Sequence, residues 1–172
     1  MKIEIRRIRP HEGPVLMQVR LFSLLDAPYA FAGTYFDSVQ QPADHWADRA
    51  AAGSVGGSVA IYLAHAPDGP VGIAGAYEPD DYTETRRIYG VWVERALRKQ
   101  GLGERLVDTL LEWADGSGAA RCDLWVTETN TPAVALYERL GFEDTGLRQP
   151  LPSNPTILEK KLVRPAGREP SA

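Results

Sequence analysis

Apolar and polar positions follow two different periods along this chain, and each period predicts one kind of secondary structure. The apolar stretch 59–79 is interrupted by Pro67-Asp68-Gly69-Pro70, which predicts a hairpin of two strands. One further short strand is expected after Gly141. Other runs have period two and are rich in β-branched residues, and they predict strands at 2–9, 85–93, 121–127 and 155–163.

Helices are predicted where apolar residues recur every three or four positions. Such segments occupy residues 43–53 and 131–141, and another begins near Gly103. The aromatic segment 28–42 is bounded by prolines and predicts a loop, or a loop with a short turn. In the first helix, expected within residues 11–27, the spacing is carried by Val15, Leu16, Val19, Phe22 and Leu24.

The order of these elements predicts the fold class. Hairpin strands followed by β-α-β units are typical of a mixed sheet with helices on both faces. We therefore expect an α/β (α+β) fold with a mixed central sheet of six to seven strands. A single domain should span residues 1–163, and the polar, proline-rich residues 164–172 predict a disordered tail.

Composition and charge exclude several function classes. The 172 residues are 44% hydrophobic and 24% charged, as in a soluble globular domain, and the net charge of −4 disfavours nucleic acid as a partner. A lone cysteine, Cys122, permits neither an intrachain disulfide nor a cysteine-cluster metal site, and the three histidines lack ligand spacing, so no metal is expected. Neither a leader peptide nor a membrane span is apparent, so we expect a cytoplasmic protein with no membrane partner.

Residues 93–107 form a cationic glycine turn between a predicted strand and a predicted helix. A helix N-terminus carries about half a positive charge and several unpaired N–H groups, and glycines let a ligand approach the backbone. Together these features predict a cradle for a phosphate or pyrophosphate. The alternative is that Gly101 relieves a tight turn and the cations form a solvated face. The turn combines Gly101 and Gly103 with Arg95, Arg98, Lys99 and Arg105.

Three phosphate-binding patterns can be compared with this turn. The P-loop pattern is absent, and the dinucleotide fingerprint fails because Leu106 stands where a third small residue is required. The sequence Arg98-Lys99-Gln100-Gly101-Leu102-Gly103 instead resembles the Q/R-x-x-G-x-G/A signature of the GCN5-related N-acetyltransferases, the GNAT superfamily. The resemblance implies that backbone amides of this loop hold the pyrophosphate of acetyl-coenzyme A.

A second resemblance lies downstream, in "TETNTPAVALYERLGF" at residues 127–142. The element order is also similar to the GNAT fold from the first strand to about Val163. The chain departs from many relatives at Arg95 and Lys99, where those have Pro and Gly, but the signature requires neither. The cofactor contacts implied by the resemblance are Trp92, Val93, Arg98, Lys99, Gln100, Gly101, Leu102, Gly103, Glu104, Asn130 and Tyr137.

Each implied role has a simpler alternative. Tyr137 is implied to be the general acid for the departing thiolate, although by default it is a core aromatic whose hydroxyl is satisfied. Asn130 is implied to meet the pantetheine arm, and it also suits the cap of the following helix. Arg98 is implied to contact a phosphate, or it is simply solvated. Cys122 alternates with apolar neighbours, which predicts a buried and unreactive thiol.

The implied reaction is direct attack of a primary amine on the acetyl thioester through a tetrahedral intermediate. Backbone N–H groups around Trp92 and Val93 are expected to stabilise its oxyanion. The amine must first lose a proton, and Glu84 is the candidate base. Other carboxylates near the expected strand ends are equally open, and so is a water chain. They are Glu78, Asp80, Asp81 and Glu94.

The acceptor amine is less well defined. Tyr29, Phe31 and Tyr35 lie in the aromatic segment and are expected to line a partly closed acceptor pocket, which favours a small-molecule amine. The alternatives are a protein N-terminal or lysine acetyltransferase with an open groove, and a non-catalytic coenzyme A-binding regulator. The intact signature and the presence of Tyr137 argue against the regulator. The sequence leaves a homodimer open and names neither the amine nor the length of the acyl group.

Overall fold

A computed structural model gives the structure of the protein, and it describes residues 1–167. Its helices are α1 (Gly13–Asp26), α2 (Tyr35–Val39), α3 (Ala43–Ser54), α4 (Leu102–Gly116) and α5 (Thr131–Arg139), with the 3-10 turns η1 (Pro28–Ala30) and η2 (Arg95–Leu97). Its strands are β1 (Glu4–Arg7), β2 (Val59–Ala66), β3 (Gly69–Tyr77), β4 (Thr85–Val93), β5 (Arg121–Thr127), β6 (Glu143–Leu151) and β7 (Asn154–Pro165).

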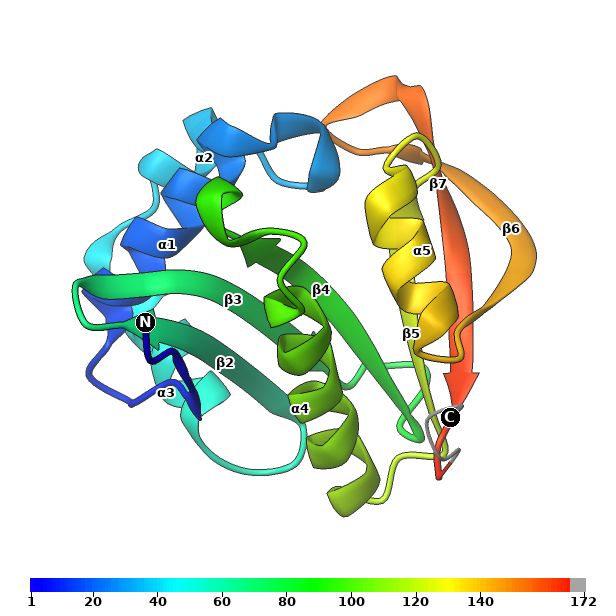
Figure 1. The fold of residues 1–172 in the computed structure, drawn as a ribbon, viewed down its shortest axis with the longest axis horizontal. Coiled ribbons are helices and arrows are strands. Elements are labelled where there is room, and N and C mark those ends of the chain that lie inside the picture. Colours follow the sequence, from blue (N-terminus) through cyan, green and yellow to red (C-terminus); the bar gives the residue numbers. More distant parts are fainter. Residues whose placement is uncertain (168–172) are drawn as a thin grey trace.

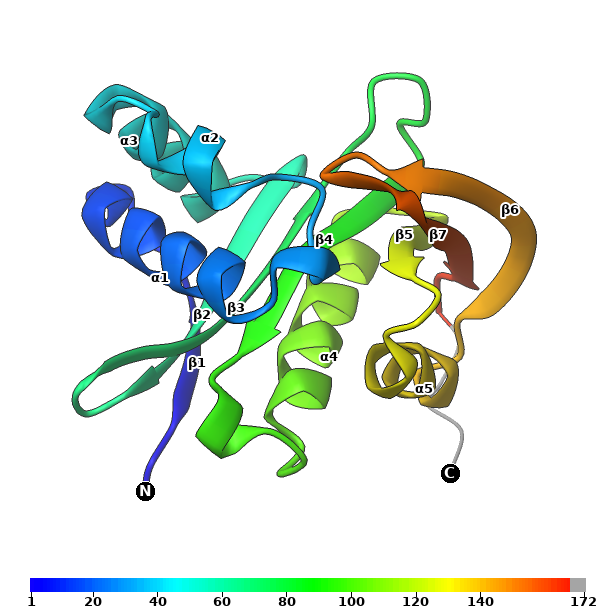
Figure 2. The ribbon, with the colours of Figure 1, turned by 90° about the horizontal axis from the view of Figure 1, so that it is seen from above.

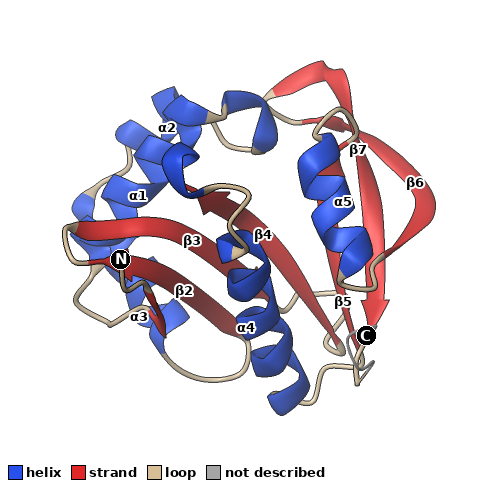
Figure 3. Ribbon diagram, viewed as in Figure 1, coloured by secondary structure: helices blue, strands red, loops and turns tan. Residues whose placement is uncertain are grey.

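The strands of the described chain form one mixed sheet in the order β1-β2-β3-β4-β5-β7-β6. Strands β4 and β5 are parallel, and the remaining neighbours are antiparallel. A parallel pair requires a crossover, and α4 supplies it (Figure 3). The predicted mixed sheet of six to seven strands is therefore confirmed.

Helices cover both faces of this sheet, as predicted. Helices α4 and α5 lie on one face, and α1 and α3 lie on the other (Figures 1 and 2). The first face buries a cluster that joins α4 and α5 to the sheet, whereas the second buries residues of α1 and α3 with Trp92 of β4. Alternation along β2 divides its side chains between the layers: Ala60 and Ala64 face α4, and Ile61 and Leu63 face α1 and α3.

Strands β4 and β5 pair at one end and then diverge. Their ladder is limited to Thr85–Arg87 against Arg121–Asp123. The Arg87 guanidinium donates two hydrogen bonds of 2.8 Å to the Asp123 carboxylate, which locks the joined end. Beyond that point the strands separate toward Val93 and Thr127 (Figure 1). The β5-facing edge of β4 is thus left without a strand partner over most of its length.

A β-bulge interrupts β4 beside this divergence. Ile73 pairs with Trp92 and Gly75 with Tyr89, so three steps along β4 match two steps along β3. The extra residue is Gly90, whose φ of +63° is accessible to glycine at no steric cost. The bulge explains why Ile88 and Val91, three residues apart, both pack toward α4.

Four details differ from the sequence-based expectations. The segment 28–42 contains η1 and α2 in addition to loops, and β6 has nine residues rather than a few. Strand β7 continues through Arg164 to Pro165, beyond the expected boundary, because these residues pair with Cys122 and Arg121 of β5. Residues 168–172 of the predicted tail lie outside the described residues. Phe22 is 55% exposed, because it is rotated away from the buried stripe of α1.

Candidate active site

The turn between β4 and α4 leaves backbone N–H groups open at the start of α4. The first helical hydrogen bond runs from the Arg105 N–H to the Gly101 carbonyl at 3.0 Å. The N–H groups of Leu102, Gly103 and Glu104 therefore have no helical partner, and no side chain caps this end. These donors add to the positive end of the helix dipole, so the site attracts an anion.

Backbone conformation completes this cradle. Gly101 has a φ of +81°, and Lys99 has a φ of +60°, the one positive φ of a non-glycine residue within the described chain. Alternation of left- and right-handed residues turns successive N–H groups toward one side, which is the geometry of an anion-binding nest. Lys99 pays on the order of 1 kcal/mol for this conformation.

Glycine at position 103 is not needed to avoid a clash within the protein, but it leaves space beside the start of α4. A Cβ at this position would lie 3.6 Å from Leu136 of α5 and 3.8 Å from Val93, both ordinary contact distances. The protein alone would therefore accept alanine here. A larger side chain would project between the start of α4 and α5, where a ligand in the cradle must also fit.

Arg98 does not project freely into this space. Its Nε donates to the Val93 carbonyl at 2.9 Å, and its Nη2 pairs with the Asp26 carboxylate at the end of α1. Asp26 also accepts from the Trp92 Nε1 at 3.0 Å and lies 3.2 Å from Arg95. Although burial acts to raise the pKa of Asp26, hydrogen bonds from Trp92 and Arg98 hold it below its ordinary value. A phosphate contact would require Arg98 to share or leave Asp26.

Asp26 was not predicted from the sequence. A carboxylate at the end of a helix is too common to single out, and its partners lie 66 to 72 residues away. In the structure it links the last turn of α1 to both β4 and the cradle loop.

Val93 presents its backbone N–H to the divergence of the strands. The Glu94 N–H bonds to the Val71 carbonyl of β3 at 2.9 Å. Because successive residues of a strand point to opposite edges, the Val93 N–H points away from β3 and toward β5. The Trp92 N–H then faces β3, and its indole is buried against α1 and α3. Of the two predicted oxyanion donors, only Val93 therefore directs its N–H toward the gap between β4 and β5.

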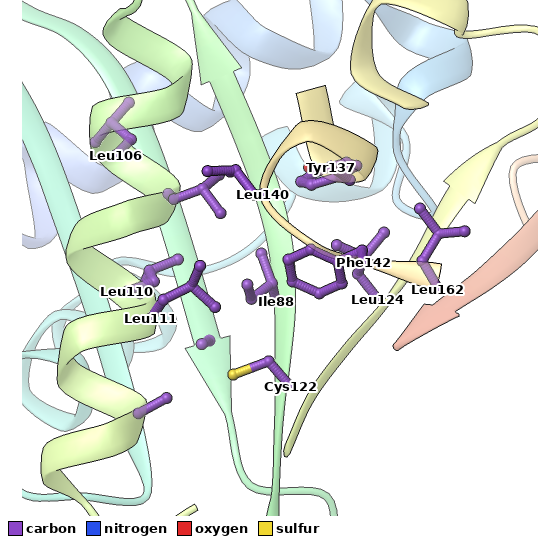
Figure 4. Packing of buried hydrophobic residues seen from close by; sticks show 14 of the residues in the cluster. Ile88, Leu106, Leu110, Leu111, Cys122, Leu124, Tyr137, Leu140, Phe142 and Leu162 are labelled. Atoms are coloured by element: carbon purple, nitrogen blue, oxygen red, sulfur yellow. The ribbon is translucent and has the colours of Figure 1, made fainter. Parts of the chain in front are cut away.

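Helix α5 brings Asn130 and Tyr137 to the other side of the divergence. The Asn130 side chain accepts from the Ala133 N–H at 3.4 Å, so the capping role is present. Tyr137 is buried within the core cluster, edge-to-face with Phe142 (Figure 4). Burial raises the pKa of its phenol.

Two predicted cofactor residues already have side-chain partners. Glu104 lies 3.7 Å from Arg139, which joins the first turn of α4 to the end of α5. The Gln100 side chain donates to the Ala96 carbonyl at 3.1 Å and closes the loop on itself. Both residues are thus placed to shape the cradle.

The aromatic segment lines a cavity of about 270 Å³ with a mostly apolar wall. Tyr29 and Tyr35 contribute to this wall, whereas Phe31 is buried beside it. Two hydrogen bonds fix the segment across the end of β5: Thr127 Oγ1 donates to the Tyr29 carbonyl at 2.9 Å, and Ser153 Oγ donates to the Phe31 carbonyl at 2.7 Å. The segment that lines the cavity is therefore fastened beside the end of β5. The lining residues of the cavity are Leu24, Leu25, Pro28, Tyr29, Gly33, Thr34, Tyr35 and Ser153.

The structure does not bring Glu84 to the cradle. Glu84 is exposed and immediately precedes β4, where its carbonyl accepts from Ala120 at the joined end. Eight residue steps along β4 correspond to about 26 Å between that end and Val93. The loop that holds Glu78, Asp80 and Asp81 lies at the same joined end, and Glu78 pairs with Arg86 at 2.8 Å. Of the five predicted carboxylates, Glu94 alone lies beside the cradle.

The structure also tests the predictions for Cys122, for a metal site and for a membrane span. Cys122 is buried, and this burial raises the pKa of its thiol to about 12, so it is unreactive as predicted. Across residues 1–167 no group of three or more His, Cys, Asp or Glu side chains is arranged to hold a metal ion. None of the helices in this part of the chain combines the length and apolar character needed to cross a membrane.

Comparison with known proteins agrees with this geometry. The sequence model of the Acetyltransferase (GNAT) family matches residues 21–142, which is more than half of the chain. This chain belongs to the GNAT family. The match contains both the cradle loop and the Asn130–Phe142 segment, so the resemblance inferred from the two motifs is confirmed.

Individual relatives of this GNAT protein are more distant. Mycothiol acetyltransferase of Corynebacterium glutamicum is 46% identical over 59 residues, 34% of this chain but only 20% of that protein. The ribosomal protein bS18-alanine N-acetyltransferase of Escherichia coli is 34% identical over 62 residues, 36% of this chain and 42% of that enzyme. The chain thus spans less than half the length of either relative.

A solved structure shares the whole fold. The Salmonella typhimurium protein yncA, described as an acetyltransferase with its cofactor acetyl-CoA, superposes with a TM-score of 0.78. The superposition covers 100% of this chain and 98% of yncA at 14% sequence identity. At that identity the likeness establishes the GNAT fold alone.

Proposed function

We propose that this protein is an acetyl-CoA-dependent N-acetyltransferase that acts on the primary amine of a small molecule. The observation that carries the proposal is the uncapped start of α4, where three free N–H groups open beside the divergence of β4 and β5. Membership of the GNAT family supports the same cofactor. A pyrophosphate is the anion that such a cradle and its neighbouring cations would hold.

The chain's own residues divide the work of the transfer. Acetyl-CoA, as cosubstrate, supplies an acetyl group activated as a thioester. The N–H groups of Leu102, Gly103 and Glu104 bind its phosphates, and the Val93 N–H is directed at the place where negative charge develops during attack. Tyr137 keeps its proton because burial raises the pKa of its phenol, so it is suited to protonate the thiolate.

Removal of the proton from the attacking amine does not need Glu84. Glu84 lies at the joined end of the strands, so a chain of water molecules or Glu94 is better supported as the route for that proton. The attacking amine must be uncharged when it reacts. Because it can lose its proton before it binds, the enzyme does not need a strongly basic residue.

The acceptor pocket favours a small molecule. A half-open cavity of about 270 Å³, lined largely by the aromatic segment, suits a compact amine better than an extended peptide. The similarity to an enzyme named for a ribosomal protein substrate keeps a peptide amine as the second candidate. A panel of small amines and short peptides, assayed by thiol release from acetyl-CoA, separates the two. Turnover confined to peptides would contradict the small-molecule proposal.

Gly101→Asp tests the cradle directly. The substitution places a negatively charged side chain beside the free N–H groups, on a residue whose backbone is in the left-handed region. The affinity for acetyl-CoA should therefore fall at least tenfold, about 1.4 kcal/mol. Gly118→Asp is the matched control, because Gly118 has a φ of +78° and equal space but follows the far end of α4. Isothermal calorimetry that finds equal affinity in the two folded variants would refute the cradle assignment.

A further inference from the structure

Arg20 occupies an unusual position in α1. At 100° per residue it lies at the centre of the stripe that α1 buries, flanked by Leu16, Ser23 and Leu24. Buried cations in proteins are normally paired with a carboxylate. Arg20 has no such pair, since within the described chain its Nη1 is shielded from solvent and has no hydrogen-bond partner.

The surroundings of Arg20 make this position more electropositive. Its guanidinium lies 5.0 Å from the centre of the Phe31 ring, which holds it by a cation–π contact. Burial, and then the nearby positive charge of Arg49, lower the pKa of Arg20 to about 10. The neighbouring polar group is the Tyr89 phenol, which accepts from the Arg49 Nη2 at 3.3 Å. Two half-buried arginines thus lie close together, and no acidic group balances them among residues 1–167.

A second unpaired donor belongs to the same layer. Among the described residues, the buried side-chain nitrogen and oxygen atoms that lack a partner are Arg20 Nη1 and Trp46 Nε1. Trp46 packs in the core between α1, α3 and β4, and the Arg49 guanidinium lies 5.8 Å from its ring. Both unpaired atoms are N–H donors, so the group that would satisfy them is an acceptor. An anionic acceptor would also balance the positive charge of Arg20 and Arg49.

Gly90 connects this site to the reacting strand. The Arg20 Nη1 lies 2.9 Å from the point where a Cβ of Gly90 would stand, so the guanidinium rests against the backbone of the β4 bulge. Val93, whose N–H faces the divergence, is three residues further along β4, about 10 Å. Leu24, one turn after Arg20 on α1, lines the acceptor cavity. An acceptor that extends from that cavity by one helical turn along α1, about 6 Å, would meet Arg20.

We propose that Arg20 and Arg49 bind a carboxylate of the acceptor, so that the substrate is an amine with a carboxylate a few bonds away, as in an amino acid. The inference rests on the proposed function and names the substrate class of the same site. A planar guanidinium suits a carboxylate because it offers two parallel N–H groups. The amine would then lie beside the divergence while the carboxylate lies against the bulge.

Matched acceptors test this proposal. Each amino acid of a panel is compared with its carboxamide and its aminophosphonate analogue, by kcat/KM for thiol release from acetyl-CoA. We expect the wild-type protein to prefer the best amino acid over its carboxamide at least tenfold. In Arg20→Gln that ratio should fall to about one, and Arg49→Gln should also reduce it. The exposed Arg121, at the joined end of the sheet, gives the control variant Arg121→Gln, which should keep the wild-type ratio.

Stability distinguishes a binding role of Arg20 from a structural one. Because Arg20 is an unpaired cation, Arg20→Gln should keep or raise the melting temperature, whereas loss of a structural arginine would lower it. A lower melting temperature with an unchanged preference ratio would overturn the proposal. So would a wild-type protein that accepts carboxamides as well as carboxylates, or one that prefers the aminophosphonates to the carboxylates.

A binding measurement keeps the proposal separate from the proposed function. N-acetylalanine and N-acetylalaninamide are titrated into the protein with coenzyme A, and the melting temperature is followed. Stabilisation by N-acetylalanine alone, lost in Arg20→Gln, would support the carboxylate site even if no amine were acetylated. Equal effects of the two compounds would overturn it even in an active enzyme.

Discussion

At the scale of single residues, Tyr137 and Cys122 show that burial has opposite consequences for two weak acids. Burial raises the pKa of both. For Cys122 this removes the thiolate and with it any nucleophilic role. For Tyr137 it keeps the phenol protonated, which is the form that a general acid needs.

Tyr137→Phe separates the catalytic role from the structural one. The substitution keeps the ring and its edge-to-face contact with Phe142 and removes the hydroxyl. The rate constant kcat should fall roughly 100-fold, while the melting temperature and the acetyl-CoA affinity stay nearly unchanged. If a folded variant keeps the wild-type kcat in an assay limited by chemistry, Tyr137 is a core residue and the general acid lies elsewhere.

At the scale of elements, the segment from η1 to α2 joins the two halves of the site. It follows Asp26, which is bonded to Trp92 and Arg98, and it is fastened to β5 and to the β6–β7 turn by Thr127 and Ser153. These contacts place the segment across the open end of the divergence, as Figure 2 shows. The element is therefore positioned to form the acceptor wall while contacting the cofactor side through Asp26.

Tyr35→Ala tests this element with a control on the same helix. Tyr35 lines the cavity, whereas its neighbour Phe36 is 73% exposed and does not. Loss of the Tyr35 ring should shift the order of preferred amines and raise KM for the best one several-fold, with acetyl-CoA affinity unchanged. Phe36→Ala should alter neither. Calorimetry that shows weaker cofactor binding with an unaltered amine preference would assign the segment to the cofactor side instead.

At the scale of the whole molecule, Glu12 ties the first strand to the first helix. Its carboxylate accepts from Arg6 at 2.6 and 2.9 Å and from the Arg9 N–H at 2.8 Å. The Arg6 hydrogen bonds are the largest influence on the pKa of Glu12, which falls to about 2 against the opposing effect of burial. His65 also faces this pair, and burial lowers its pKa.

The pH dependence of stability follows from the sign of the Glu12 shift. A lowered pKa in the folded state contributes stability above the unfolded value near 4.3, and that contribution is lost as pH falls toward 2. Glu12→Gln should lower the free energy of unfolding by about 2 kcal/mol at pH 7. The gap between wild type and variant should close between about pH 5 and 2, as urea unfolding at each pH can show. The exposed Asp144→Asn is the control, and it should have a smaller effect.

The sequence by itself determined the features that depend on contiguous residues. The Arg98–Gly103 signature marks the cradle because the cradle consists of successive backbone N–H groups, whose positions follow from local φ and ψ angles. The Asn130 cap, the buried face of Cys122 and the mixed sheet follow equally from short-range spacing and alternation. The family could therefore be recognised before any coordinates.

Only the tertiary structure decided the features that depend on distant contacts. Arg20 reads as one more polar residue in an amphipathic helix, until packing places it against Gly90, 70 residues later, without a counter-ion. Glu84 and Glu94 flank the strand predicted at 85–93, but only the short β4–β5 ladder showed that the Glu84 end is joined to β5 and the Glu94 end is open. Asp26 became visible through its bonds to Trp92 and Arg98. Side-chain charge acts through space, over a few ångströms, and the sequence does not record which residues the fold brings within that range.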